Sequence, residues 1–420
     1  MSKQQLPNAA ILREWLEAHG GVFHPSVEFR NDPLTGLSPF ASTELPSGET
    51  LVSCPFELAV TPEESTRAIC DICGLDDSEL QGWNERMRIC GYLGLHLTRA
   101  ASGVDLPSSL RHLPYINALP PCSELLTPLF YSPAELELLA GTNLYGAVHD
   151  REQELRAEYE QVQSKLRGDA PSWDQYLSCA TYISSRAFPS KLLRIPDSGS
   201  VETRAVDTSE EEESHPVLLP GVDLFNHARG QPITWLSSPM NISNKQVKTI
   251  SLVSCTIVKA GQQVFNNYGP KSNEELLLAY GFILDPNPDD TVILRLGTNG
   301  LPEGIVEKLK AKQLDATKRF ALGADGLVPN ELLQVMRVML GGADEEVEID
   351  EEDEHALHAQ EQKETELELD VLGQLGAMLE DKLQRLKSHK GDSQVDGVRE
   401  HVRKMCVVYR EGERAPEFGA

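Results

Sequence analysis

The sequence predicts an α+β protein, in which short strands and longer helical stretches alternate along 420 residues. Short apolar segments bounded by Gly and Pro, typical of strands, occur before residue 55 and again between residues 217 and 265. Apolar residues at helical spacing fill the intervening stretch and the region beyond residue 301. A chain of this length indicates two or three domains. We therefore expect a β fold of small sheets, with an inserted helical block and an all-helical C-terminal domain.

The N-terminal region begins with a predicted helix over Asn8–His19, because Pro7 suits a helix start and Gly20-Gly21 suits a helix end. Strands are expected next, at Val27–Arg30, Phe40–Ser42 and Thr50–Cys54. Thr61 then has the features of a helix N-cap, with Pro62 in the first turn.

Residues 63–188 form the expected helical block. Within it, the pattern predicts a charged, exposed helix over Asp150–Leu166, and a capping box of Ser172 and Gln175 that opens another helix. Arg194–Pro216 interrupts the pattern with Gly, Ser and an acidic run, which predicts a mobile surface loop.

Strand character returns after this loop, at Val217–Leu219, Lys248–Val253 and Gln263–Phe265. A short capped helix is expected from Ser272 to Gly281. The C-terminal stretch is helical again, at Pro302–Lys312, at Asn330–Leu340 and along leucines from Leu372 to Leu386. An acidic loop, Asp344–Glu354, lies between the last two of these.

Composition limits the classes of partner. The net charge of −27 makes nucleic acid a poor partner, because affinity for phosphates comes from clustered Lys and Arg. A basic protein substrate suits this charge, although acidity that only keeps the protein soluble explains it as well. The sequence contains no apolar run of membrane-spanning length, and its start lacks the pattern of a secretion signal.

Eight cysteines without regular spacing fit a reducing compartment, so we expect a protein of the cytoplasm, the nucleus or both. Cys70-Asp71-Ile72-Cys73 has no second pair at a usable spacing and is interpreted as part of a helix end. No metal is expected, and we expect a monomer.

Three segments carry dense polar residues at junctions of strand and helix: Ser184–Phe188, Asp223–His227 and Tyr268–Phe282. Polar residues fenced by apolar ones tend to be buried and need partners, so together they suggest the wall of a polar pocket. Each has an ordinary structural reading by itself. Tyr268-Gly269 could be a turn, His227 and Tyr280 core residues, and Arg186 a helix cap.

Taken together, the motifs resemble those of the SET-domain methyltransferases. The similarity is to the branch that contains the plant Rubisco large-subunit lysine methyltransferase, the fungal ribosomal lysine methyltransferases and the actin histidine methyltransferase. The motifs that carry it are Thr35-Gly36-Leu37 with Phe40-Ala41, Ser185–Phe188, Asp223–His227, and Tyr268-Gly269 with Ser272–Leu278 and Tyr280–Phe282. They occur in the family's order, and the resemblance is strong from Val22 to Leu296.

The resemblance implies S-adenosyl-L-methionine as the cofactor. The residues that it implies for cofactor binding are Gly36, Leu37, Arg186, Asn226, His227, Tyr268 and Phe282. Of these, the Asn-His pair would hold the adenine and amino-acid ends, largely through backbone groups. The first motif departs from the family's frequent Gly-x-Gly, because Ser38-Pro39 stands where the second Gly would fall. That loop is therefore expected to approach the cofactor differently.

The resemblance also implies a protein side chain as the substrate, entering through a narrow channel. Tyr268 would be the catalytic residue, and the substrate-binding set would be Arg186, Asp223, Tyr268 and Tyr280. Lysine has a pKa near 10.4, so only roughly one amine in a thousand is neutral at pH 7. A site that desolvates the amine lowers that pKa, and a fixed phenol can align the lone pair without carrying charge.

The resulting domain prediction has four parts. Residues 1–62 and 186–300 would form the two halves of a SET domain, 63–185 its helical insertion, and 301–420 a helical substrate-binding domain with an acidic loop at 343–354. The predicted function is S-adenosylmethionine-dependent methylation of a lysine in a non-histone protein, such as a ribosomal protein or a translation factor. Two alternatives stay open: a histidine methyltransferase, and a non-catalytic interaction protein on the same scaffold.

Overall fold

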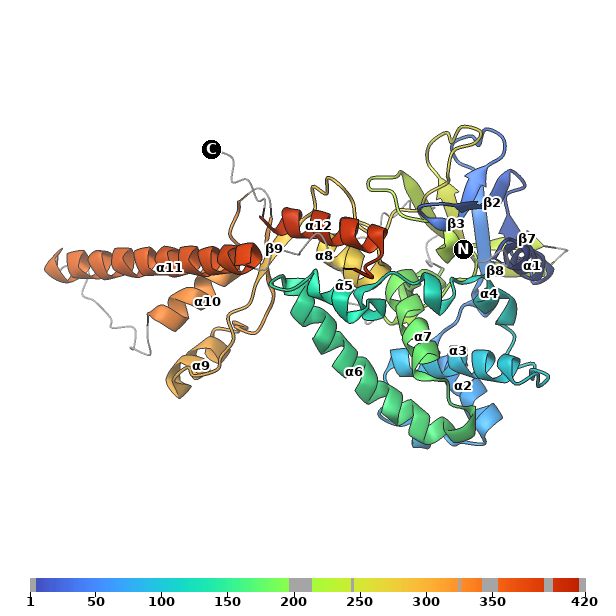
Figure 1. Cartoon of the computed structure of the whole chain (residues 1–420), viewed down its shortest axis with the longest axis horizontal. Coiled ribbons are helices and arrows are strands. Elements are labelled where there is room, and N and C mark those ends of the chain that lie inside the picture. The colour runs from blue at the N-terminus through green and yellow to red at the C-terminus, as the bar shows by residue number, and fades with distance from the viewer. Residues whose placement is uncertain are drawn as a thin grey trace. The chain divides into compact units, whose positions relative to one another are not determined.

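The structure is a computed structural model, and it describes residues 5–195, 214–242, 245–323, 326–341, 354–388 and 396–414. Most of the loop expected at Arg194–Pro216 and nearly all of the acidic loop at Asp344–Glu354 lie outside the described residues. The chain divides into two compact units, which Figure 1 draws together. The first unit comprises residues 1–127 and 150–270, and the second comprises residues 128–149 and 271–420.

The first unit contains small antiparallel sheets. Its strands are β1 (Val22–Phe23), β2 (Val27–Asp32), β3 (Gly36–Ala41), β4 (Thr50–Pro55), β5 (Phe188–Pro189), β6 (Pro216–Val217), β7 (Ile233–Ile242) and β8 (Lys245–Ser254). The largest sheet has the order β1-β4-β8-β7, while β2 pairs with β3 and β5 with β6. A strand near the start of the chain therefore pairs with one about 200 residues later, as Ser53 opposite Ser251 shows.

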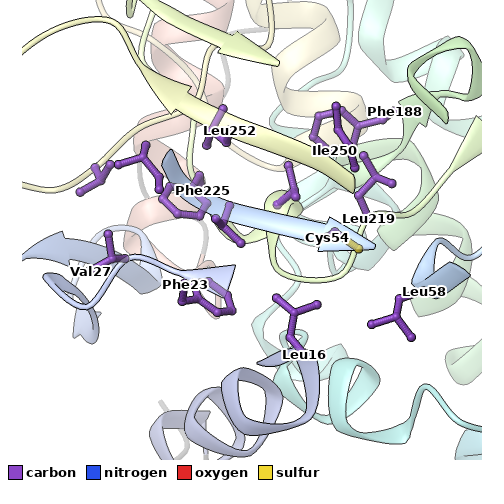
Figure 2. Packing of buried hydrophobic residues seen from close by; sticks show 14 of the residues in the cluster. Leu16, Phe23, Val27, Cys54, Leu58, Phe188, Leu219, Phe225, Ile250 and Leu252 are labelled. Carbon is purple, nitrogen blue, oxygen red and sulfur yellow. The ribbon is translucent and has the colours of Figure 1, made fainter. Parts of the chain in front are cut away.

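The core of the first unit gathers apolar side chains from these separated segments (Figure 2). Leu16 comes from the first helix, Cys54 from β4, Phe225 from a later loop and Leu252 from β8, and each is fully buried. Burial of a large apolar side chain contributes about 1.5–3 kcal/mol. The core therefore holds together the chain segments on either side of the helical block.

Several helices lie wholly within the first unit. They are α1 (Gln5–Ala18), α2 (Pro62–Cys73), α3 (Glu85–Ala101), α4 (Leu113–Ala118) and α7 (Trp173–Arg186), with the short helices η1 (Phe56–Leu58), η2 (Asp77–Leu80), η3 (Cys122–Glu124), η5 (Arg167–Asp169), η6 (Ser190–Leu193) and η7 (Val222–Leu224). The predicted N-cap at Thr61 is confirmed, because its hydroxyl accepts the backbone N–H of Glu64. The capping box of Ser172 and Gln175 is confirmed as well.

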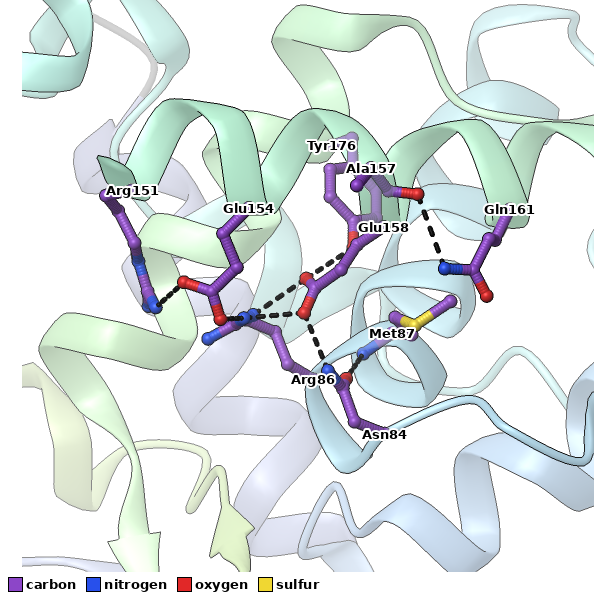
Figure 3. A network of polar contacts seen from close by, with 9 residues as sticks. All are labelled: Asn84, Arg86, Met87, Arg151, Glu154, Ala157, Glu158, Gln161 and Tyr176. Atoms are coloured by element: carbon purple, nitrogen blue, oxygen red, sulfur yellow. Dashed lines mark hydrogen bonds and ion pairs between the residues drawn. The ribbon is translucent and has the colours of Figure 1, made fainter. Parts of the chain in front are cut away.

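A buried polar network joins the helices of the insertion (Figure 3). Glu158, on α6 (Asn143–Leu166), accepts hydrogen bonds from Arg86 and Asn84 on one side and from the hydroxyl of Tyr176 on the other. A buried carboxylate is costly unless it is paired and hydrogen-bonded. These partners meet that requirement and fix how α3, α6 and α7 pack together.

The second unit is mostly helical. Its elements are η4 (Pro128–Phe130), α5 (Pro133–Glu137), the start of α6, α8 (Asn273–Glu275), the π-helix η8 (Leu276–Tyr280), β9 (Thr291–Leu294), α9 (Glu303–Ala311), β10 (Phe320–Gly323), α10 (Asn330–Leu340), α11 (Glu354–Ser388) and α12 (Glu400–Arg414). A separate apolar core includes Leu309, Leu332 and Val371. On α5, Glu135 is bound by Arg399, whose Nε and Nη2 both donate to its carboxylate.

The α+β class and the small sheets are confirmed, and four local predictions need correction. No strand was expected at β7, whose mixed sequence Ile233–Ile242 lacks clean alternation. Gln263–Phe265 is not a strand and makes only an isolated bridge between Gln263 and Phe40. The helix expected from Asp150 begins at Asn143. The strand β10, paired with β9, interrupts the stretch after residue 301 that was expected to be all helical.

Candidate active site

Two segments forty residues apart lie side by side at the centre of the candidate site. The backbone N–H of Asn266 donates to the carbonyl of Asn226 at 2.8 Å, and the N–H of Ala228 donates back to the carbonyl of Asn266 at 2.9 Å. His227 and Asn266 therefore form a parallel bridge. Because parallel pairing cannot come from a tight turn, it brings the Asp223–His227 and Tyr268 motifs together across the fold.

Tyr268 is held against His227 in two ways. Its backbone N–H donates to Nδ1 of the imidazole at 3.0 Å, and the two rings stack with centroids 5.1 Å apart. A ring nitrogen that accepts a hydrogen bond carries no proton, so this bond assigns the neutral tautomer with its proton on Nε2. The Tyr268 hydroxyl donates to the carbonyl of Phe225 at 2.9 Å. Its one proton is used there, which leaves the oxygen able to accept.

The Gly36-Leu37 motif is linked to Asn226 through Ser38, the residue that stands where the family often has a second glycine. The side-chain amide of Asn226 donates to Oγ of Ser38 at 2.8 Å, and that serine is fully buried in β3. Gly36 and Leu37 precede it in the same strand. Gly36 has a φ of +72°, so a residue with a side chain would be strained at this turn. Ser38 thus supplies the side-chain acceptor for the asparagine.

Arg186 and Asp223 meet at the end of α7. The guanidinium Nη1 of Arg186 donates to the backbone carbonyl of Asp223 at 2.6 Å, so this arginine bonds to η7. Asp223 is 3% exposed, and its carboxylate accepts a hydrogen bond from the hydroxyl of Tyr115 on α4. Burial raises the pKa of Asp223 to about 6, against the opposing effects of the Arg186 charge and the Tyr115 hydrogen bond.

Tyr280 and Phe282 belong to the second unit. Their rings make an edge-to-face contact with centroids 6.1 Å apart, and the Lys271 ammonium lies 5.9 Å from the Tyr280 ring centre. Burial raises the pKa of Tyr280 to about 12, so its phenol is neutral at physiological pH. The substrate contact predicted for Tyr280 and the cofactor contact predicted for Phe282 stay predictions.

The second unit also has a cavity of about 270 Å³ that none of the predicted site residues lines. Asp285, Asp290 and Glu411 give it an acidic lining. The carboxylate of Asp290 is already engaged, because it accepts from the backbone N–H of Asn273 at 2.6 Å and from the amide of the same residue at 2.8 Å. We interpret these bonds as the contacts that hold the two ends of the loop after η8 together.

Among the helices that the structure describes, none is long and apolar enough to cross a membrane.

Three groups at the site are not predicted from the sequence. Asn266 stands just before the Tyr268 motif, and a polar residue directly after the apolar run Val264-Phe265 was a usable signal. Ser38 was noted only as a missing glycine. Tyr115 gave no signal, because it lies in the helical block more than a hundred residues from its partner. Such long-range pairs are set by tertiary packing and not by local pattern.

Comparison of the sequence with known proteins found related methyltransferases. The chain is 32% identical over 293 residues to the ribosomal lysine N-methyltransferase set10 of Schizosaccharomyces pombe, covering 68% of this chain and 47% of that protein. It is 26% identical over 338 residues to the protein-lysine N-methyltransferase EFM1 of Saccharomyces cerevisiae, covering 70% and 52%. The chain thus spans about half the length of these relatives. No protein-family model matches it.

Solved structures agree with the sequence comparison. The SET domain of LSMT bound to lysine and AdoHcy superposes with a TM-score of 0.69 at 20% identity, covering 97% of this chain and 88% of that one. Rubisco LSMT bound to AdoMet gives 0.67, with 97% and 89% covered. The chain therefore has the SET-domain fold, and the resemblance carried by its motifs is confirmed.

Proposed function

We propose that this chain is an S-adenosylmethionine-dependent protein-lysine N-methyltransferase that acts on a non-histone protein. The immobilised phenol of Tyr268 is the observation that carries this proposal. Stacking on His227 and a hydrogen bond to the Phe225 carbonyl fix the hydroxyl in position and direction. A methyl transfer needs the nitrogen lone pair aligned with the methyl carbon, and such alignment contributes several kcal/mol to the barrier reduction.

Two buried polar groups of the candidate site fit the proposed cofactor chemically. The Nε of Arg186 and the Nδ2 of Asn266 are buried N–H donors without a hydrogen-bond partner among the described residues. Buried donors without acceptors cost free energy, and the carboxylate of an amino-acid ligand is a strong acceptor. When bound, S-adenosylmethionine supplies an electrophilic methyl group on a sulfonium. Gly36, Leu37 and the Asn226-His227 pair would complete its surroundings.

The chain's own residues would handle the amine. The Tyr268 oxygen, whose proton is directed to Phe225, would accept an N–H of the incoming nitrogen and orient its lone pair. Arg186 holds the Asp223 carbonyl, which keeps the neighbouring wall of the site in place. Burial would desolvate the amine and lower its pKa, and this favours the neutral form that attacks. We propose Arg186, Asp223, Tyr268 and Tyr280 as the substrate-binding set.

Two observations support a basic protein substrate. The first is the set10 relative, whose name describes a ribosomal lysine N-methyltransferase. The second is the acidity of α11, whose exposed side chains in one stretch include Glu361, Glu364, Glu366 and Asp370 against a single lysine, Lys363. Complementary charge speeds the encounter of protein partners and favours correct ones. We therefore propose a ribosomal protein or translation factor with a basic, lysine-bearing segment, bound in part by residues 301–420.

The proposed substrates imply action in the cytoplasm or the nucleus, and we propose that the enzyme is a monomer without a nucleic-acid partner. The test is to incubate the chain with labelled S-adenosylmethionine and separated ribosomal proteins and translation factors, then map the product by mass spectrometry. Methyl groups on a lysine support the proposal. Methyl groups on a histidine would instead identify a histidine methyltransferase. If no protein is labelled and S-adenosylhomocysteine does not bind, the result favours a non-catalytic interaction protein.

A further inference from the structure

A carboxylate and a tyrosine of the first unit are buried together beside the candidate site. Asp223 lies in η7 and is 3% exposed, while Tyr115 on α4 is fully buried. The tyrosine hydroxyl donates to Oδ2 of Asp223. Placing an ionisable group here costs free energy that an apolar residue would not. The pair therefore calls for an explanation beyond core packing.

The position of η7 suggests what the pair does. Arg186 bonds the backbone carbonyl of Asp223 from the end of α7, and Tyr115 bonds its side chain from α4. The short helix is thus held from two elements of the helical block. The chain leaves η7 directly into Phe225, whose carbonyl accepts the Tyr268 hydroxyl, and then into Asn226. Any displacement of η7 would therefore move the groups that hold the phenol.

We propose that Tyr115 is a positioning residue for the methyl-transfer site, acting through Asp223 to fix the segment that carries Phe225, Asn226 and His227. This inference rests on the proposed function for its catalytic consequence. The hydrogen bond between Tyr115 and Asp223, and its effect on stability, are independent of the proposed function. The helical insertion then acts as a support for the site, since its α4 supplies the hydroxyl.

The ionisation of Asp223 makes the pH dependence of stability a test that packing alone would not affect. The charged or titratable groups facing Asp223 are Tyr115 from α4, Arg186 from α7 and Cys54 from β4. Burial raises the pKa of the Tyr115 phenol and of the Cys54 thiol, so both stay neutral. Asp223, whose pKa burial raises to about 6, is therefore the group of this cluster that titrates near neutrality.

Removing the hydroxyl should raise the pKa of Asp223 further. The Tyr115 hydrogen bond stabilises the carboxylate and opposes the effect of burial, so Tyr115→Phe removes that opposition. A group whose pKa is raised on folding contributes stability at low pH, and this contribution is lost as pH rises through the folded-state pKa. In the wild type that loss ends near pH 6. In Tyr115→Phe it should extend about one pH unit higher.

The matched control is Tyr176→Phe. Tyr176 is also fully buried and also donates to a carboxylate, that of Glu158, at 3.2 Å. Glu158 also accepts hydrogen bonds from Arg86 and Asn84, and these bonds remain in the variant. This variant should lose a similar amount of stability, with the same pH dependence as the wild type.

The experiment measures the free energy of unfolding from pH 5 to pH 8 for the wild type, Tyr115→Phe and Tyr176→Phe, and S-adenosylhomocysteine binding by calorimetry. Tyr115→Phe should show the extended pH dependence and bind the ligand roughly tenfold more weakly. Equal pH curves for the two variants, or unchanged ligand affinity in Tyr115→Phe, would overturn the inference. If the wild type binds no S-adenosylhomocysteine, the proposed function fails, while the unfolding curves still decide whether Tyr115 controls Asp223.

Discussion

Replacement of Tyr268 by phenylalanine removes one oxygen atom and leaves most of its surroundings intact. The ring would keep its stacking on His227, and the backbone N–H would still donate to that imidazole. The substitution eliminates the hydrogen bond from the hydroxyl to the Phe225 carbonyl. One such hydrogen bond contributes about 1 kcal/mol, so the variant should fold and lose about that much stability. Ligand binding should change little.

Methyl transfer should respond much more strongly than stability. If the phenol orients the amine, its loss lets the nitrogen move, and a misplacement of about 1 Å costs roughly a hundredfold in rate. We expect kcat to fall by about that factor while the dissociation constant of S-adenosylhomocysteine stays within about twofold of the wild type. The assay is transfer of labelled methyl groups at saturating cofactor, beside calorimetric binding and urea denaturation.

Tyr182→Phe is the control for this prediction. Its hydroxyl also donates to a backbone carbonyl, that of Pro120, at 2.6 Å, and the side chain is buried. The two variants remove the same kind of bond from the same unit. Tyr182→Phe should lose similar stability and keep its activity. If Tyr268→Phe retains as much transfer as Tyr182→Phe, the catalytic role assigned to the phenol is wrong.

Three further outcomes follow from the described side chains. Ser38→Ala removes the acceptor of Asn226 and should weaken S-adenosylhomocysteine binding several-fold by calorimetry, with folding unchanged. Burial lowers the pKa of His96 to about 4 and that of His112 to about 3, below the ordinary 6.5. Stability is therefore lost as pH falls, by about 2 kcal/mol per histidine at pH 5, and urea denaturation at pH 5 and 7 checks this. Glu158→Leu removes the carboxylate that accepts from Asn84 and Arg86, and among the described residues it leaves the half-buried guanidinium paired with Glu154 alone. This loss should cost about 1–3 kcal/mol in the same assay, whereas an unchanged midpoint would show that the network is dispensable.

Local chemistry made much of the fold predictable. Helix caps are read from adjacent residues, so Thr61 and Ser172 were identified correctly. Apolar periodicity located α10 at its observed bounds, Asn330–Leu340. It failed at β7, where a proline and several polar residues obscure a strand held by pairing with β8. The strand β7 is stabilised by its pairing with β8, and the sequence pattern of one segment does not reveal which segment pairs with it.

The candidate site divides in the same way. Tyr268, Asn226 and His227 stand in motifs dense enough to notice, and the structure joins them through backbone pairing and ring stacking. The roles of Gly36 and Leu37 came from resemblance and stay predictions, although both lie in the strand of the serine that binds Asn226. What the sequence could not indicate is the set of partners that each motif needs.

Those partners change how the helical insertion is understood. The sequence predicts only that a block of helices is inserted between two strand regions, and it assigns the block no part in the site. Its α4 and α7 instead supply Tyr115 and Arg186, the two side chains that hold Asp223. Because η7 precedes Phe225 without an intervening loop, the side chains of α4 and α7 bond to the segment that carries the phenol-binding carbonyl. Mutations in α4 should therefore affect methyl transfer even where the mutated residue contacts neither cofactor nor substrate. Loss of the Tyr115 hydroxyl should reduce transfer more than a change of packing volume does.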